Sequence, residues 1–272
     1  MIEKRLAELR ENGAKALIPF ITAGDPDMQT TVELVLAMDR AGADVIELGV
    51  PFSDPVADGP AIQKASIRSL AGGTTLGGIL DAVKEIRNKS DIPLVLMTYY
   101  NPVYQFGLEK FIDQAASAGV NGLIVPDLPF EEAAPLREPA KEKGISLIPL
   151  VAPNSPEERI KKITTRAGGF IYCVSSLGVT GVRRSIETDL ADFVIRVRKY
   201  SRLPVAVGFG ISGPAQAAGV ARYCDAVIVG SALVKLIEEY ANSGNLVEIL
   251  AAKVRELKEA LSLKEVETVA AL

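Results

Sequence analysis

Eight continuously apolar runs recur along this 272-residue chain, and they restrict its fold more than any other feature. Continuous runs, unlike alternating ones, are typical of a parallel sheet that is covered on both faces. Segments with helical periodicity separate most of the runs. Glycines such as Gly42 and Gly119 precede several runs, where a left-handed residue can end a helix. The runs span residues 16–23, 44–52, 93–100, 122–128, 146–151, 169–174, 204–209 and 226–229.

The repeated order of strand and helix predicts an α/β fold, namely a (β/α)8 TIM barrel. A doubly wound open sheet is the alternative, but it rarely needs eight uninterrupted repeats. Ile2, Leu6 and Leu9 add a short amphipathic helix at the N-terminus, and Ser155 with Glu158 predicts a capping box at a later helix start. Because no linker divides the chain, we expect a single domain over residues 1–272.

Composition excludes several classes of protein and of site. No apolar run is long enough to span a membrane and no signal-peptide pattern is present, so we expect a cytoplasmic protein. The net charge of −4 and the lack of a basic stripe argue against nucleic-acid binding. Since the chain contains no His, proton transfer must fall to other side chains, and we predict no metal site. Cys173 and Cys224 lie alone in apolar runs, which is typical of reduced core cysteines.

A carboxylate at the end of the second run is the first catalytic candidate. Glu47 follows Asp44-Val45-Ile46, and a charged, unpaired Glu in such a run costs several kcal/mol. It therefore tends to shift its pKa or to find a partner. At the mouth of a strand, such a group is a candidate acid or base. The alternative is a Glu held by structural hydrogen bonds or by a Lys or Arg.

Three further acids stand in loops. Asp58 lies eleven residues after Glu47, and its position before Gly59-Pro60 favours a turn-forming role on pattern alone. Asp54, next to Pro55, has the same interpretation. Asp127 ends the fourth run and could be either a site residue or a loop anchor.

Two glycine-rich segments follow the seventh and eighth runs. Gly210 lies in the first, and Gly230 and Ser231 form the second. In this fold the last two β–α loops are the usual phosphate site, because backbone N–H groups and a helix N-terminus favour an anion. The alternative is that these glycines only make tight turns.

The mouth of the barrel also receives a long loop and several large side chains. Residues 175–185 are rich in small residues, which suits a lid over the substrate or an ordinary surface loop. Tyr172 precedes this loop and either points into the mouth or is a buried Tyr bonded to backbone. The apolar candidates, which suit a flat apolar ligand or ordinary core, are Phe20, Met97, Tyr99, Leu150 and Phe209.

Four stretches in this order resemble the tryptophan synthase alpha subunit family. They are residues 19–26, 47–60, 175–181 and 208–212, and the second reads ELGVPFSDPVADGP. The resemblance covers essentially the whole chain. It implies a (β/α)8 barrel that cleaves indole-3-glycerol phosphate to indole and glyceraldehyde 3-phosphate.

The resemblance also implies roles for individual residues. Glu47 and Asp58 match the catalytic acids, and Tyr172 matches a Tyr near the reacting chain. Asp54 matches a residue that faces the beta subunit. The residues that match the substrate site are Phe20, Tyr99, Leu150 and Phe209 for the indole pocket, Thr180 and Gly181 for the lid, and Gly181, Gly210, Gly230 and Ser231 for the phosphate.

The family implies an αββα heterotetramer, in which pyridoxal phosphate belongs to the beta subunit and no cofactor is expected in this chain. Three alternatives stay open at this point. They are a barrel enzyme acting on another phosphorylated sugar, a partner-gating subunit with low activity alone, and a stand-alone indole-releasing lyase.

Overall fold

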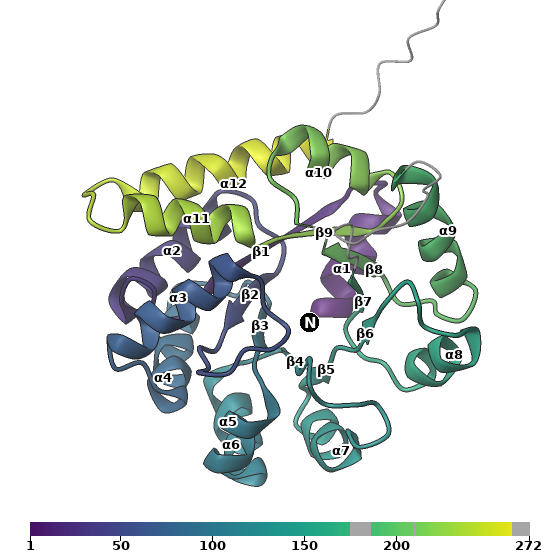
Figure 1. Ribbon diagram of the computed structural model, residues 1–272, viewed down its shortest axis with the longest axis horizontal. Helices are drawn as coiled ribbons and strands as arrows, with labels where there is room; N and C mark the ends of the chain where they lie inside the picture. Colours follow the sequence, from purple (N-terminus) through teal and green to yellow (C-terminus); the bar gives the residue numbers. More distant parts are fainter. Residues whose placement is uncertain (175–185, 209, 263–272) are drawn as a thin grey trace, which may run out of the picture.

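A ring of parallel strands surrounded by helices forms the protein (Figure 1). This computed structural model describes residues 1–174, 186–208 and 210–262. Neighbouring strands are hydrogen-bonded in the order β5-β4-β3-β2-β1-β9-β8-β7-β6. The strands are β1 (Ala16–Thr22), β2 (Ile46–Gly49), β3 (Leu94–Met97), β4 (Gly122–Ile124), β5 (Ser146–Leu147), β6 (Leu150–Val151), β7 (Ile171–Val174), β8 (Val205–Gly208) and β9 (Ala226–Val229).

The ends of this order, β5 and β6, are two halves of the fifth predicted run, 146–151. Proline has no N–H to donate to a neighbouring strand, and Pro149 lies between the halves. The first half continues its pairing with β4 through Ile148, whose N–H donates to Leu123 O at 2.8 Å. The second pairs with β7, and Tyr172 N–H donates to Pro149 O at 3.0 Å. One continuous segment thus closes the ring, and the predicted (β/α)8 barrel is confirmed.

Helices cover the outside of the ring, and one closes its end. The described helices are α1 (Ile2–Glu11), α2 (Met28–Arg40), α3 (Pro60–Ala71), α4 (Leu76–Arg87), α5 (Tyr100–Phe106), α6 (Leu108–Ala118), α7 (Ala134–Glu142), α8 (Glu157–Thr165), α9 (Ile186–Arg198), α10 (Pro214–Ala221), α11 (Ser231–Tyr240) and α12 (Leu246–Ser262). Gly42 and Gly119 have positive φ at the ends of α2 and α6, as expected. No helix in the described ranges is long and apolar enough to cross a membrane.

The capping box predicted at the start of α8 is wrong. Helix α8 begins at Glu157 with Pro156 as its N-cap residue, and no side chain caps it. The Ser155 hydroxyl instead accepts a hydrogen bond from Ala152 N–H at 3.3 Å. The turn before the helix therefore uses the oxygen that the capping box requires.

The predicted N-terminal helix packs against the inside of the barrel. Ile2 and Leu6 of α1 are buried in one cluster with inward-facing residues such as Ile18, Val45 and Phe170. A second, larger cluster lies between the sheet and the outer helices. Figure 1 shows α1 behind the centre of the ring. Helix α1 thus fills the end of the barrel opposite the loops discussed below.

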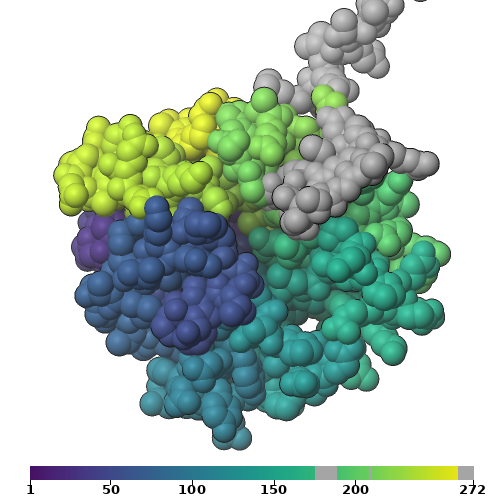
Figure 2. Space-filling view, viewed as in Figure 1, coloured from purple at the N-terminus to yellow at the C-terminus, as the bar shows by residue number. Residues whose placement is uncertain are grey.

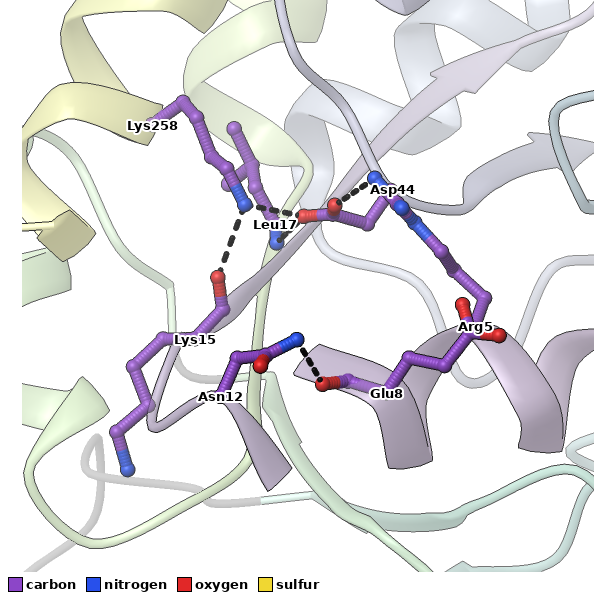
Figure 3. Close-up of polar contacts among 7 residues, drawn as sticks. All are labelled: Arg5, Glu8, Asn12, Lys15, Leu17, Asp44 and Lys258. Atoms are coloured by element: carbon purple, nitrogen blue, oxygen red, sulfur yellow. Dashed lines mark hydrogen bonds and ion pairs between the residues drawn. The ribbon is translucent and has the colours of Figure 1, made fainter. Parts of the chain in front are cut away.

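A buried carboxylate ties three segments together beside α1 (Figure 3). Asp44 is 1% exposed and accepts hydrogen bonds from Arg5 at 2.9 Å and from Lys258 at 2.6 Å. It also accepts the backbone N–H of Leu17 at 2.9 Å. Lys258 additionally donates to the carbonyl of Lys15 at 3.0 Å. Because one ion contacts α1, β1 and α12 together, this acid has a structural role.

Alternation along the strands decides which residues face the barrel interior. Side chains two residues apart lie on the same face of a strand. Since Val45 belongs to the inner cluster, Glu47 faces inward as well, whereas Ile46 belongs to the outer cluster. By the same alternation Phe20 faces inward, as Ile18 does. The side chains of Glu47 and Phe20 therefore both lie at the barrel mouth.

Candidate active site

Glu47 is a buried carboxyl group inside the barrel. It lies on β2, paired in register with Phe20 of β1 and Val95 of β3, and only 1% of its surface is exposed. Neither carboxyl oxygen has a hydrogen-bond partner among the residues that the structure describes. Burial, together with the negative charge of Asp58, raises the pKa of Glu47 to about 8. Among the described residues, no Lys, Arg or structural hydrogen bond holds the Glu47 carboxyl group, so that alternative is not observed.

Asp58 comes from the loop after β2, residues 50–59, which Figure 1 shows in front of the strand ends and Figure 2 shows, in dark blue, on the surface of the same face. Its N–H donates to Pro55 O at 3.0 Å, so the predicted turn exists. Its half-buried carboxyl group nevertheless faces the site, where it acts electrostatically on Glu47. Burial raises the pKa of Asp58 to about 6, and a hydrogen bond from Tyr99 opposes that rise. The turn and a role in the site are therefore compatible.

Tyr99 holds this loop against the barrel. Its side chain is 3% exposed, and its hydroxyl accepts a hydrogen bond from Ala57 N–H at 2.9 Å. The hydroxyl also bonds the Asp58 carboxyl group, and the Tyr99 ring lies 5.2 Å from the ring of Phe52. Burial and the charge of Asp58 raise the pKa of Tyr99, so it stays a neutral hydrogen-bond donor. Tyr99 thus positions Asp58 as well as forming a wall.

A small pocket lies against Asp58 and Tyr99. Its lining comes from β1, β2, β3 and α3 and consists of Phe20, Thr22, Gly49, Val50, Asp58, Ile62, Ser66, Met97 and Tyr99. The hydroxyl of Thr22 is buried and has no partner among the described residues. The pocket therefore combines apolar walls with a few polar groups, and its volume of about 10 Å³ has room for about one water molecule.

Tyr172 and Leu150 lie on two other strands of the barrel. They are in register on β7 and β6, and both pack against the inner cluster. Burial, followed by the charges of Glu47 and Asp58, raises the pKa of Tyr172 well above its usual value. Its phenol therefore carries a proton and lies within electrostatic reach of both acids, and its role in the site stays a prediction.

The two glycine-rich loops lie side by side, because β8 and β9 pair with Gly208 opposite Ile228. Gly210 has φ +61°, a conformation that favours glycine. Gly230 is the N-cap residue of α11, and Ser231 is its first residue. The first N–H groups of a helix have no acceptor within the helix, so this helix start can receive an anion. The start of α11 therefore offers N–H groups that favour an anion, and the phosphate role of both loops stays a prediction.

Comparison with known proteins identifies the family. The family model for the tryptophan synthase alpha chain matches residues 6–262. The chain belongs to the tryptophan synthase alpha chain family. This membership places it in tryptophan biosynthesis, as the alpha component of tryptophan synthase. The alpha chain of Caldanaerobacter subterraneus subsp. tengcongensis is 51% identical over 97% of this chain and 98% of that relative.

Solved structures of the family share the fold. The alpha subunit from Legionella pneumophila str. Paris has a TM-score of 0.89 at 38% identity, covering 96% of this chain and 98% of that one. A chain in the tryptophan synthase complex from Pyrococcus furiosus has a TM-score of 0.81 at 43% identity, covering 90% and 98%. The family likeness therefore includes structures solved as complexes, and it supports a beta-subunit partner for this chain.

Several of the residues singled out above lie away from the pocket or outside the described ranges. Asp54 is exposed on the loop 50–59 and accepts a hydrogen bond from Ser53 Oγ at 2.5 Å. Asp127 accepts Tyr100 N–H at 2.9 Å at the start of α5, so it anchors a loop. The predictions for Thr180, Gly181 and Phe209, and for the loop 175–185, fall outside the described residues.

Two glycines make space for site side chains, and reasoning from sequence missed that role. A Cβ atom on Gly49 would lie 2.6 Å from the ring of Phe20, and one on Gly208 would lie 2.5 Å from the hydroxyl of Tyr172. Real Cβ contacts are never this short. Any other residue at either position would displace an aromatic wall. The only signal in the sequence is a Gly inside a predicted strand.

Proposed function

We propose that this chain cleaves indole-3-glycerol phosphate to indole and glyceraldehyde 3-phosphate, as a carbon–carbon lyase. One observation carries the proposal: a buried carboxyl group, Glu47, faces a second acid, Asp58, at the barrel mouth, and nothing described neutralises it. Such an arrangement is costly for folding and is typical of an acid or base that works in a site. The tryptophan synthase alpha chain family supports the same reaction.

Glu47 provides the proton transfers. Because its pKa is about 8, it is mostly protonated near neutral pH and can donate a proton to C3 of the indole ring. The resulting carboxylate then removes the proton from the hydroxyl on the chain carbon bonded to C3. The carbon–carbon electron pair returns to the ring, an aldehyde forms, and Glu47 recovers its proton. One group therefore serves as acid and then as base without net proton change.

Asp58 provides charge stabilisation. Protonation at C3 places positive charge on the indole nitrogen, and an ionised carboxylate beside that N–H stabilises it. The pKa of about 6 leaves Asp58 ionised near neutral pH, whereas Glu47 is not. Two carboxyl groups with separated pKa values thus take two different roles.

The remaining site residues hold the substrate. The indole ring would lie between Phe20, Leu150 and Tyr99, with Tyr172 beside the reacting chain, and Phe209 and Thr180 are expected to complete the enclosure. At the other end, N–H groups near Gly181, Gly210 and Gly230, with the Ser231 hydroxyl, would bind the phosphate. Inorganic phosphate and glycerol phosphate should then compete with the substrate at millimolar concentration.

The partner surface lies on the same side as the mouth. Asp54 is exposed on the loop that carries Asp58, and Val56 beside it is an apolar side chain with 84% exposure. An exposed apolar residue on a catalytic loop suits contact with the beta subunit, which would couple docking to the position of Asp58. We propose an αββα heterotetramer in the cytoplasm, with pyridoxal phosphate confined to the beta subunit and no cofactor in this chain.

Measuring indole release with and without the beta subunit tests the function and its variants. A stand-alone lyase would show full turnover alone, and a partner-gating subunit would show little turnover unless the beta subunit is added. A barrel enzyme acting on another phosphorylated sugar would release no indole under either condition. A crystal structure with indole-propanol phosphate would then test the positions of Glu47, the indole pocket and the phosphate site together.

A further inference from the structure

A second cavity lies outside the strand ring, between α7 and α8, which follow one another around the barrel (Figure 1). Its volume is about 160 Å³, and its apolar walls include Leu128, Phe130, Leu147, Pro149 and Ile163. The cavity shares no lining residue with the pocket around Asp58. Leu150 lines the cavity on the side of the barrel. A dry cavity of about 150 Å³ is large enough to hold a benzene molecule. This cavity therefore has room for one six-membered ring.

A buried cation forms part of this cavity. Arg137 of α7 is 7% exposed, and its Cζ atom lies 5.4 Å from the centre of the Phe130 ring. Its Nε and Nη2 groups both contact one oxygen of Glu138 at 3.0 Å, and the Glu138 side chain is 56% exposed. The Nη1 group is buried and has no acceptor among the described residues. A guanidinium so deeply buried normally has all of its donors paired. The unpaired Nη1 group of Arg137 is therefore an exception that an added acceptor would remove.

The charged residues around the cavity are all of one sign. Besides Arg137, the lining includes Arg159 and Arg166, and it includes no Asp or Glu. Arg159 already bonds Glu131 through two contacts, at 3.1 and 3.3 Å. Arg166 is exposed at the edge of the cavity. Because Glu138 and Glu131 offset two of these cations, an anion in the cavity would gain mainly from Arg166 and from the unpaired Nη1 donor of Arg137, while the apolar side chains of the walls favour an apolar body.

We propose that this cavity binds a small aromatic monocarboxylate, with its ring against Phe130 and its carboxylate on Arg137 and Arg166. A planar two-oxygen acceptor matches the geometry of a guanidinium. A phosphate dianion suits the cavity less well, because apolar side chains form most of its walls and Arg137 is the only buried lining residue in the described ranges with a free donor. The proposal does not depend on the proposed catalytic reaction, although Leu150 lines this cavity and is also assigned to the indole pocket.

Calorimetric titration of the full-length protein with benzoate tests this proposal, with benzyl alcohol as the neutral probe of nearly equal shape. Both titrations are done with indole-propanol phosphate present, and a crystal soaked with benzoate locates the ligand directly. Four proteins are compared: the wild type, Arg137→Gln, Arg166→Gln, and Lys162→Gln as the control. Lys162 is an exposed cation on α8 that does not line the cavity.

We expect saturable benzoate binding that is at least about tenfold tighter than benzyl alcohol binding, because the charged hydrogen bonds need the carboxylate. Arg137→Gln should weaken benzoate about tenfold or more, Arg166→Gln less, and Lys162→Gln not at all. If Arg137→Gln does not fold, the comparison of the two probes on the wild type and on Arg166→Gln decides. Equal affinity for both probes, no saturation at millimolar benzoate, or benzoate located only in the barrel mouth overturns the proposal.

Discussion

The carboxyl groups of Glu47 and Asp58, which lie eleven positions apart in the chain, interact electrostatically at the barrel mouth. Burial is the main reason that the pKa of Glu47 rises to about 8, and the charge of Asp58 adds to it. The pKa of Asp58 rises only to about 6, since the loop is half-exposed and Tyr99 donates a hydrogen bond to it. Near neutral pH the pair therefore holds one proton, on Glu47.

The first prediction concerns the pH dependence of cleavage. We expect kcat/KM for indole release to rise as Asp58 ionises around pH 6 and to fall as Glu47 loses its proton around pH 8. Asp58→Asn should lower kcat strongly and remove the acidic limb. A rate that keeps increasing through pH 9 would show that no protonated Glu47 is needed.

The second prediction concerns Tyr99. Replacing it with Phe removes the hydrogen bond that lowers the pKa of Asp58, so the acidic limb should move to higher pH. The same change frees Ala57 N–H and should lower kcat at neutral pH. Tyr104→Phe, at an exposed Tyr on α5, is the control and should leave the profile unchanged. An unshifted acidic limb in Tyr99→Phe would mean that Tyr99 does not tune Asp58.

Much of the fold could be predicted from the sequence, because continuous apolar runs and helical periodicity are local signals. The N-terminal helix and the joint glycines at 42 and 119 were predicted for that reason. The break in the fifth strand at Pro149 was not, since a proline within a run does not say which neighbour each half will pair with. The Ser155 hydroxyl bonds a turn rather than the helix, because two short-range partners compete for one oxygen.

The candidate site was predictable to a smaller extent. Alternation along a strand places Glu47 on the same face as Val45, and Phe20 on the same face as Ile18, but a continuously apolar run does not tell which face points inward, and only the packing of the inner cluster does. Whether Glu47 would find a cation could not be read from the sequence, because such partners come from distant segments, as Lys258 does for Asp44. The space that Gly49 and Gly208 leave for aromatic rings likewise depends on packing between strands.

The third prediction tests that packing. Gly208→Ala places a methyl group 2.5 Å from the hydroxyl of Tyr172, so the phenol must move. We expect kcat/KM to fall roughly 10- to 100-fold, the loss expected when a site group is displaced by about 1 Å. The matched control is Gly219→Ala in α10, where an added Cβ meets nothing within 4 Å. Equal activity of the two variants would remove Tyr172 from the site.

The fourth prediction concerns stability. Folding raises the pKa of Glu47 from 4.5 to about 8, so the folded state holds the proton more tightly than the unfolded state, and stability falls as pH rises between these values. Glu47→Gln cannot ionise and escapes this loss. Relative to the wild type, it should gain on the order of 3 kcal/mol at pH 7 compared with pH 4.5.

Chemical denaturation at both pH values measures this gain. The change in the stability difference between the two pH values is independent of any constant cost of burying the amide. Glu33→Gln, at an exposed position on α2, is the control and should show no such slope. A stability difference between Glu47→Gln and the wild type that does not change with pH would contradict the proposed pKa of Glu47.

The most direct measurement is single-turnover indole release from indole-3-glycerol phosphate by Glu47→Gln, with Glu33→Gln as the control. The amide keeps the shape of the side chain but can neither donate nor accept the proton as the acid does. We expect indole release to fall to background while indole-propanol phosphate still binds with nearly wild-type affinity. Substantial residual release by a variant that binds the analogue normally would contradict the assignment of Glu47 as the group that moves the proton.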